Sequence, residues 1–118
     1  MVARAPDPQV FAALADGTRL SLVTRLQQMP SLSTTQLAEG TGLSRQAIRK
    51  HLGVLAEVGL VHDRRSGRQR LWELDARPLS GVSDWADAVR QAWEARLDRL
   101  DAFLLAHADA SDPSGEST

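Results

Sequence analysis

Cationic and amide side chains gather at two places in this chain, residues 44–51 and residues 64–68. The first place carries Ser44, Arg45, Gln46, Arg49, Lys50 and His51. Arginine can bond a guanine bidentately and glutamine an adenine, while serine and lysine more often hold phosphate. The second place carries Arg64, Arg65 and Arg68, which can lie along a DNA backbone or in a minor groove. These residue types predict a surface that binds double-stranded DNA.

Both groups also have a plainer interpretation. Arginines on a helix most often form a solvated charged face, and a basic loop is by itself most often a charged surface turn. DNA binding is favoured because a capped helix and a glycine turn precede the cationic helix, and the basic hairpin follows it directly. A winged helix that docks protein partners is the competing class, and its signature is an apolar recognition face, which this chain lacks.

The charge distribution supports a DNA-binding patch. The whole chain has a formal net charge of −1, whereas residues 43–70 hold seven cations and two carboxylates, a net +5 that leaves −6 for the remainder. Phosphates respond to such a patch within a Debye length, so the near-neutral total does not argue against nucleic acid as the partner.

The elements that must position these side chains form a helix-turn-helix over residues 33–58. Ser33 and Gln36 have the spacing of a capping box, and Gly40 and Gly42 permit a tight turn. Ser44 can cap the second helix, whose apolar residues recur at helical spacing: Ile48, Leu52, Leu55 and Val58. The second helix is therefore expected to enter the major groove.

Elements on both sides complete the predicted fold. Before the helix-turn-helix, Pro8 and Asp16 are placed to begin two helices. After it, residues 60–74 read as a β-hairpin, the wing, with the basic loop at its tip. Together with a long last helix, residues 78–107, these elements predict a mainly α fold with a small β-hairpin. This winged helix-turn-helix domain covers residues 8–107, between a flexible leader (1–7) and a disordered tail (108–118).

The last helix carries an apolar stripe that a domain of this size has little room to bury. A helix stripe usually packs into a core. Here a second copy is favoured as its partner, which gives a two-fold homodimer able to bind two half-sites. The interface residues expected are Phe11, Val82, Trp85, Val89, Trp93, Leu97 and Leu100.

Several classes of function are disfavoured. The chain has no cysteine, so it has no disulfide and no thiolate metal site. No apolar run approaches the length of a membrane span, and we expect a cytoplasmic protein. No Ser–His–acid arrangement, phosphate-cradling glycine loop or buried carboxylate pair suggests an enzyme or a cofactor. His51 is expected to make a structural hydrogen bond or a phosphate contact, and His62 to be exposed.

From Phe11 to about Leu104 the chain resembles the ArsR (arsenical-resistance repressor-like) family of bacterial winged-helix regulators. The matching segments are LADGTRLSLVTRL at 14–26, QLAEGTGLSRQAIRKHLGVLAEVGLV at 36–61 and RRSGRQRLWEL at 64–74. The most specific part is His51–Leu52 with Leu55 and 59–61. The resemblance implies a homodimer that binds palindromic operator DNA, usually as a repressor.

The chain departs from the metal-sensing members of that family. Their sensing cysteines would fall around residues 31–36, where this sequence has none. Their other sensor needs two histidines on the last helix, which here offers His107 and an acidic face of Asp84, Asp87, Asp98 and Asp101. Metal sensing is therefore disfavoured, and the resemblance extends to a metal-independent branch. An apolar effector site near Trp85 and Trp93 stays open as an alternative, and no effector is identified.

Overall fold

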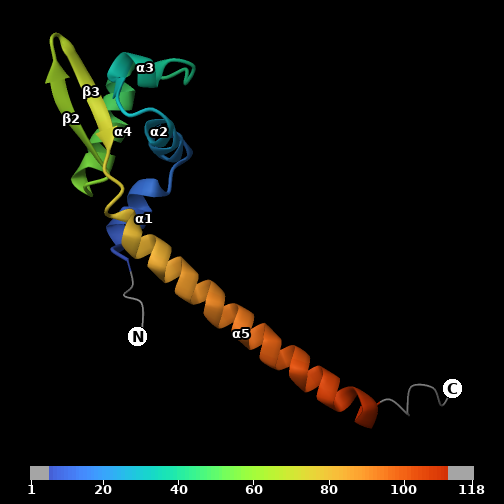
Figure 1. The fold of residues 1–118 in the computed structure, drawn as a ribbon. Helices are drawn as coiled ribbons and strands as arrows, with labels where there is room; N and C mark the ends of the chain where they lie inside the picture. Colours follow the sequence, from blue (N-terminus) through green and yellow to red (C-terminus); the bar gives the residue numbers. More distant parts are fainter. Residues whose placement is uncertain (1–5, 112–118) are drawn as a thin grey trace.

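The computed structural model describes residues 6–111, which fold into a small helical domain with a long helix projecting from it (Figure 1). The helices are α1 (Pro8–Leu14), α2 (Gly17–Gln28), α3 (Thr34–Ala38), α4 (Arg45–Glu57) and α5 (Leu79–Ser111). The strands are β1 (Leu32–Ser33), β2 (Val61–Ser66) and β3 (Gln69–Leu74). Most of the expected leader and tail, residues 1–5 and 112–118, lies outside the described residues. The tail was expected to begin at residue 108, whereas α5 continues through Ser111.

Side-chain caps begin the helices at the expected positions. Asp16 Oδ2 accepts the backbone N–H of Arg19 at 3.0 Å and so begins α2. The capping box of α3 is complete, because Ser33 Oγ accepts from Gln36 N at 3.1 Å and Gln36 Oε1 accepts from Ser33 N at 2.8 Å. Ser44 Oγ accepts from Ala47 N at 3.1 Å at the start of α4. These bonds fix where each helix of the helix-turn-helix begins.

Glycines make the turns that separate these elements. Gly40 and Gly42, between α3 and α4, have φ of 77° and 74°, in the left-handed region that favours glycine. Gly59 has φ 81° after α4, and the next residue, Leu60, donates its N–H back to Leu55 O at 3.0 Å. This closure ends α4 and leads the chain into the wing.

The hydrophobic core lies among α1–α4 and the base of the sheet. Its fully buried side chains are Leu22, Leu37, Ile48, Leu52, Leu55 and Leu60. Trp72 of β3 is 3% exposed, and its Nε1–H donates to Thr34 Oγ1 at 2.9 Å. Because Thr34 is the first residue of α3, this bond ties the wing to the first helix of the helix-turn-helix.

The sheet has three antiparallel strands in the order β1–β3–β2. The predicted hairpin is confirmed, with Val61 opposite Leu74 at its base and Ser66 opposite Gln69 at its tip. The sequence did not predict β1, a two-residue strand that pairs Leu32 with Trp72. It exists only because β3 lies beside it.

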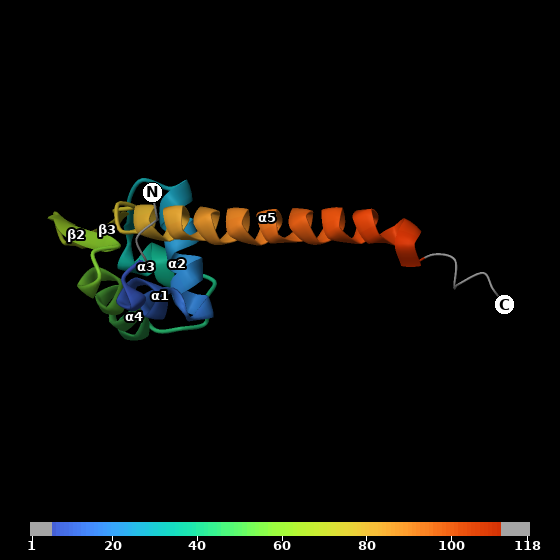
Figure 2. The ribbon, with the colours of Figure 1, turned by 90° about the horizontal axis from the view of Figure 1, so that it is seen from below.

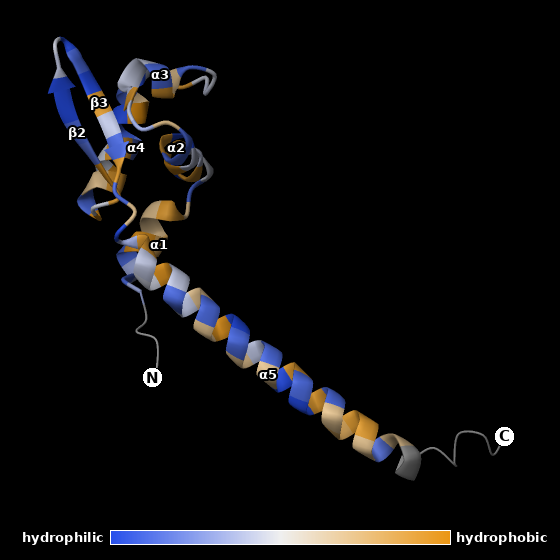
Figure 3. Cartoon of the chain, viewed as in Figure 1, coloured by the Kyte–Doolittle hydropathy of each residue, from blue (hydrophilic) through white to orange (hydrophobic). Residues whose placement is uncertain are grey.

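Helix α5 projects away from the domain. Leu79 and Val82 pack against the core, and the rest of the helix extends past it in both views (Figures 1 and 2). The molecule measures 80 × 37 × 21 Å with a radius of gyration of 23.2 Å. A compact chain of this length has a radius of gyration of about 13–14 Å. Apolar segments recur along the projecting helix (Figure 3).

Candidate nucleic-acid interface

Helix α4 presents polar side chains to solvent and apolar side chains to the core. Ile48, Leu52 and Leu55 are 0% exposed and face the core. The residues predicted to bind DNA on this helix are all exposed: Ser44, Arg45, Gln46, Arg49 and Lys50. Since residues four apart are neighbours on a helix, Arg45 lies beside Arg49 and Gln46 beside Lys50. Because the apolar side of α4 is packed against the core, these two rows of polar side chains face solvent.

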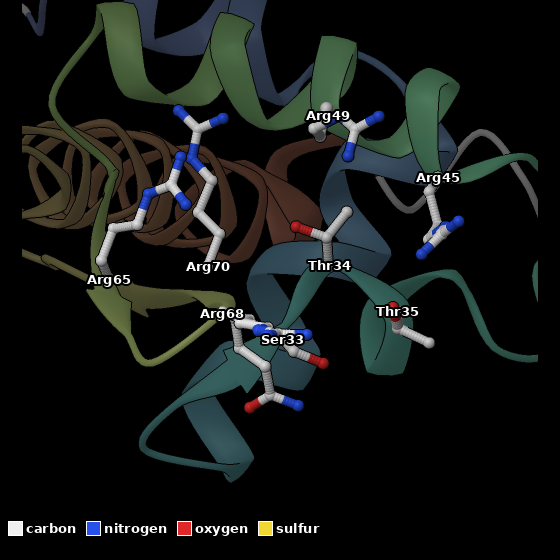
Figure 4. A pocket seen from close by; sticks show the side chains of 9 residues that line it. Ser33, Thr34, Thr35, Arg45, Arg49, Arg65, Arg68 and Arg70 are labelled. Carbon is white, nitrogen blue, oxygen red and sulfur yellow. The ribbon is translucent and has the colours of Figure 1, made fainter.

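A cationic cleft of about 410 Å³ separates the first of these rows from the wing. Its lining comes from α4, the wing, β1 and the start of α3: Arg45, Arg49, Arg65, Arg68, Gln69, Arg70, Ser33, Thr34 and Thr35. In Figure 4, Arg65 and Arg70 extend from the sheet toward α4, and Arg45 and Arg49 extend from α4. Five guanidinium groups and three hydroxyls around one hollow suit an oxyanion such as a phosphodiester.

Arg70 is held in the cleft by its neighbours. It is the cross-strand partner of Arg65, and its guanidinium lies over the Trp72 ring, 4.9 Å from the centroid. Its Nε donates to Asp63 Oδ2, and this hydrogen bond keeps the pKa of the Asp63 carboxyl below its usual value. Arg70 was counted in the cationic segment but was not predicted as a contact residue. Its register opposite Arg65 is the signal that places it there.

Arg64 points to a different environment. Its Nε donates to Glu73 Oε2 at 3.1 Å, and this bond is the main reason that the pKa of Glu73 is lowered. His62, which is exposed as expected, lies 3.2 Å from the other oxygen of Glu73. Arg64 therefore sits in an ion-pair cluster on the hairpin and does not line the cleft, unlike Arg65 and Arg68.

The second polar row of α4 borders a separate hollow of about 370 Å³, lined by Ser44, Gln46, Ala47 and Lys50. This hollow lies on the outer side of the recognition helix. The predicted α4 residues therefore divide into two sets, with Arg45 and Arg49 facing the wing and Ser44, Gln46 and Lys50 facing outward.

His51 lies away from both hollows. Its Nδ1 is 3.3 Å from Arg19 Nη1 and 3.9 Å from Asp16 Oδ2, and the side chain is 25% exposed. Of the two roles predicted for His51, the geometry matches the structural hydrogen bond.

The residues predicted for the dimer interface form an exposed apolar row. Val82 is half-buried against the core, and Phe11 packs edge-on against Trp85 with ring centroids 5.4 Å apart. The others stand on the projecting helix, where Val89 is 48%, Trp93 56%, Leu97 41% and Leu100 51% exposed. Phe103 and Leu104, which are 55% and 56% exposed, extend the row.

The part of the chain that the structure describes was also searched for a metal site and for a membrane span. Among the side chains of residues 6–108, no three His, Asp or Glu groups lie close enough together to hold a metal ion. No helix in that part of the chain has the length and apolar character needed to cross a bilayer.

Comparisons with known proteins agree with this architecture. A helix-turn-helix domain model matches residues 14–64. The chain is 42% identical over 79 residues to the HTH-type transcriptional regulator Rv2034 of Mycobacterium tuberculosis, covering 67% of this chain and 72% of that protein. It is 30% identical over 97 residues to the arsenical resistance operon repressor of Escherichia coli, covering 81% and 80% of the two chains.

A solved structure also resembles most of this chain. An ArsR-like transcriptional regulator from Rhodococcus sp. RHA1 matches with a TM-score of 0.65 and 32% identity, over 81% of this chain and 90% of that one. The sequence resemblance and the winged helix-turn-helix fold are thus confirmed together. A transcriptional regulator is not an enzyme, as the sequence predicted. The chain belongs to the ArsR family of DNA-binding, winged helix-turn-helix transcriptional regulators.

Proposed function

We propose that this regulator acts as a homodimeric repressor that binds a palindromic operator and does not respond to metal ions. The main support for a dimer is the apolar row on α5, whose tryptophans and leucines are 37–56% exposed in the single chain. Isolated apolar residues on a surface are ordinary, but a continuous row on a projecting helix marks an interaction site. A second copy can cover this row by two-fold symmetry.

The two recognition helices of such a dimer would address two half-sites. Half-sites read by a two-fold dimer lie about 34–36 Å apart, or multiples of that distance, and their sequences form a palindrome. Each subunit would place Arg45, Gln46, Arg49 and Lys50 in the major groove, and Arg65 and Arg68 along the backbone or minor groove. Repression is supported by the name of the Escherichia coli relative, an operon repressor.

Metal independence is supported by the sequence. The chain has no cysteine to supply a thiolate, and its last helix has one histidine, His107. Soft-metal sensing in proteins depends on thiolate and imidazole ligands.

Genome-wide mapping of bound DNA fragments, followed by gel-shift titration of the consensus, tests this function. We expect a palindromic consensus, lower expression from a reporter with that operator, and the same affinity with zinc or with a chelator. A consensus with one unrepeated half-site would contradict the dimer. A change of affinity on adding zinc would contradict metal independence, and raised reporter expression would contradict repression.

A further inference from the structure

Arg19, in the first turn of α2, contacts both α1 and α4. Its Nε donates to Ala13 O at 2.6 Å, and its Nη2 donates to Ala12 O at 3.4 Å. These carbonyls belong to the last turn of α1, where carbonyls lack the usual helical donors, and Ala12 O also accepts the backbone N–H of Ala15 at 3.2 Å. One guanidinium therefore closes α1, and its charge suits the negative end of that helix.

The same guanidinium reaches the recognition helix. Arg19 Nη1 lies 3.3 Å from His51 Nδ1, in the middle of α4. Because a guanidinium can only donate, His51 Nδ1 is the acceptor in this contact. Asp16 completes the group, because its Oδ2 accepts from Arg19 N at 3.0 Å and lies 3.9 Å from His51 Nδ1. The Arg19 backbone N–H is the main cause of the lowered pKa of Asp16.

Helix α1 is also the element that contacts the root of α5. Phe11 packs edge-on against Trp85, and Pro6, just before α1, lies within 3.9 Å of where a Gly81 Cβ would stand. A series of contacts thus runs from α5 through α1 and Arg19 to His51 on α4. Figure 1 shows α1 between the base of α5 and the rest of the domain.

We infer that Arg19 is a positioning residue that sets the spacing between half-sites in the operator. The inference rests on the proposed homodimer, in which α5 fixes the symmetry axis. The angle between α5 and α4 then decides how far apart the two recognition helices stand. One added base pair rotates the second half-site by about a tenth of a helical turn relative to the first. A dimer whose α4–α5 angle is held firmly should bind such an operator poorly. A dimer whose angle is loosened should bind it nearly as well as the best spacing.

The test compares Arg19→Lys with Arg25→Lys. Both arginines lie on α2, and each donates to two backbone carbonyls. The acceptors of Arg25 are Leu37 O and Gln36 O, both at 2.8 Å, within the helix-turn-helix. Affinity is measured for a single half-site and for palindromes whose spacing differs by one or two base pairs. Sedimentation establishes first that each protein is a dimer.

We expect Arg19→Lys to retain the half-site affinity and to reduce the preference for the best spacing by about 2- to 30-fold, the range for changes within a coupled network. Arg25→Lys is expected to keep the preference of the unchanged protein. An unaltered preference in Arg19→Lys, or an equal loss in both variants, would overturn the inference. If the unchanged protein sediments as a monomer, the proposed dimer fails and the inference fails with it.

A second variant covers the case in which Arg19→Lys does not fold. His51→Ala removes the acceptor on α4 and leaves the bonds to α1 in place. Its spacing preference is normalised to its own half-site affinity, so a direct contact of His51 with DNA does not affect the comparison. A flattened preference supports the role of Arg19, and a preference equal to that of the unchanged protein refutes it.

Discussion

At the scale of single residues, the arginines of the interface differ in how far their charge is already compensated. Within residues 6–111, Arg64 pairs with Glu73 and Arg70 with Asp63, whereas no carboxylate pairs with Arg45, Arg49, Arg65 or Arg68. A paired guanidinium must share or release its carboxylate to bind a phosphate. The arginines without an ion-pair partner are therefore expected to contribute most to DNA affinity.

Arg49→Ala should weaken operator binding by about 1–3 kcal/mol, the usual value of a bidentate contact with a base. Gel-shift titration on the operator and on a scrambled sequence measures the change. Arg77→Ala is the matched control, because it removes the same charge from a side chain that is 89% exposed at the base of the hairpin and pairs with Asp75. Affinity that is unchanged in Arg49→Ala would remove this residue from the interface.

The Asp75–Arg77 pair gives a pH dependence. Hydrogen bonds from the Arg77 side chain and backbone lower the pKa of Asp75 from 3.8 to about 2. A carboxyl with a lowered folded-state pKa stabilises the fold above its unfolded value and loses that stabilisation as the pH falls toward the folded value. Stability should therefore decline between about pH 4 and pH 2, and less steeply in Asp75→Asn. Urea unfolding across this range is the measurement; equal slopes would contradict the prediction.

At the scale of elements, helices were predictable because their signals are local. Caps at Asp16, Ser33 and Ser44 lie within three residues of the donors they satisfy, and the positive φ of Gly40 and Gly42 is a property of single residues. The hairpin was predictable for the same reason. Strand β1 was not, since it depends on pairing with β3 about forty residues away, as Leu32 and Trp72 do.

The residues that line the cleft were likewise predictable only where the signal is local. Arg45, Arg49, Arg65 and Arg68 were predicted as DNA contacts from charge and position, and the cleft gathers all four. Arg70 and Thr34 join them only after the sheet has formed, because the contacts of Trp72 bring these residues to the same side of the wing.

The wing as an element should govern the salt dependence of binding. Each arginine that neutralises a phosphate contributes about one unit to the slope of log K against log salt. Arg65→Ala and Arg68→Ala should each lower the slope by about one and weaken all sequences alike. Arg64→Ala should lower it less, because Glu73 already holds this guanidinium. A slope change in Arg64→Ala as large as in Arg65→Ala would contradict that order.

At the scale of the whole molecule, the long helix was predictable from the spacing of its apolar residues. That most of this helix would not pack against the rest of the domain was also predictable, since a domain this small has little apolar surface to cover such a stripe. The observed radius of gyration, 23.2 Å, expresses that excess length. How two copies would be oriented in a dimer could not be predicted, because that orientation depends on contacts between the two chains.

Trp93→Glu or Leu97→Glu should produce monomers, because a charge would replace an apolar side chain in the middle of the proposed interface. Operator affinity should fall by about 10²- to 10⁴-fold, the gain that linking two binding modules provides. Gln91→Glu is the control, since it adds the same charge on the opposite face of α5. Sedimentation and gel shift measure both effects. A monomeric unchanged protein, or dimers that persist in both variants, would contradict the prediction.

The three tryptophans occupy three separate structural regions, and the chain has no tyrosine. Trp72 is buried in the wing at 3% exposure, Trp85 lies at the junction of α1 and α5, and Trp93 stands at 56% exposure on the apolar row. Intrinsic fluorescence is therefore a ready-made reporter of each region. Variants that keep one tryptophan and replace the others by phenylalanine would report wing unfolding, junction movement and subunit association in separate signals, without an attached dye.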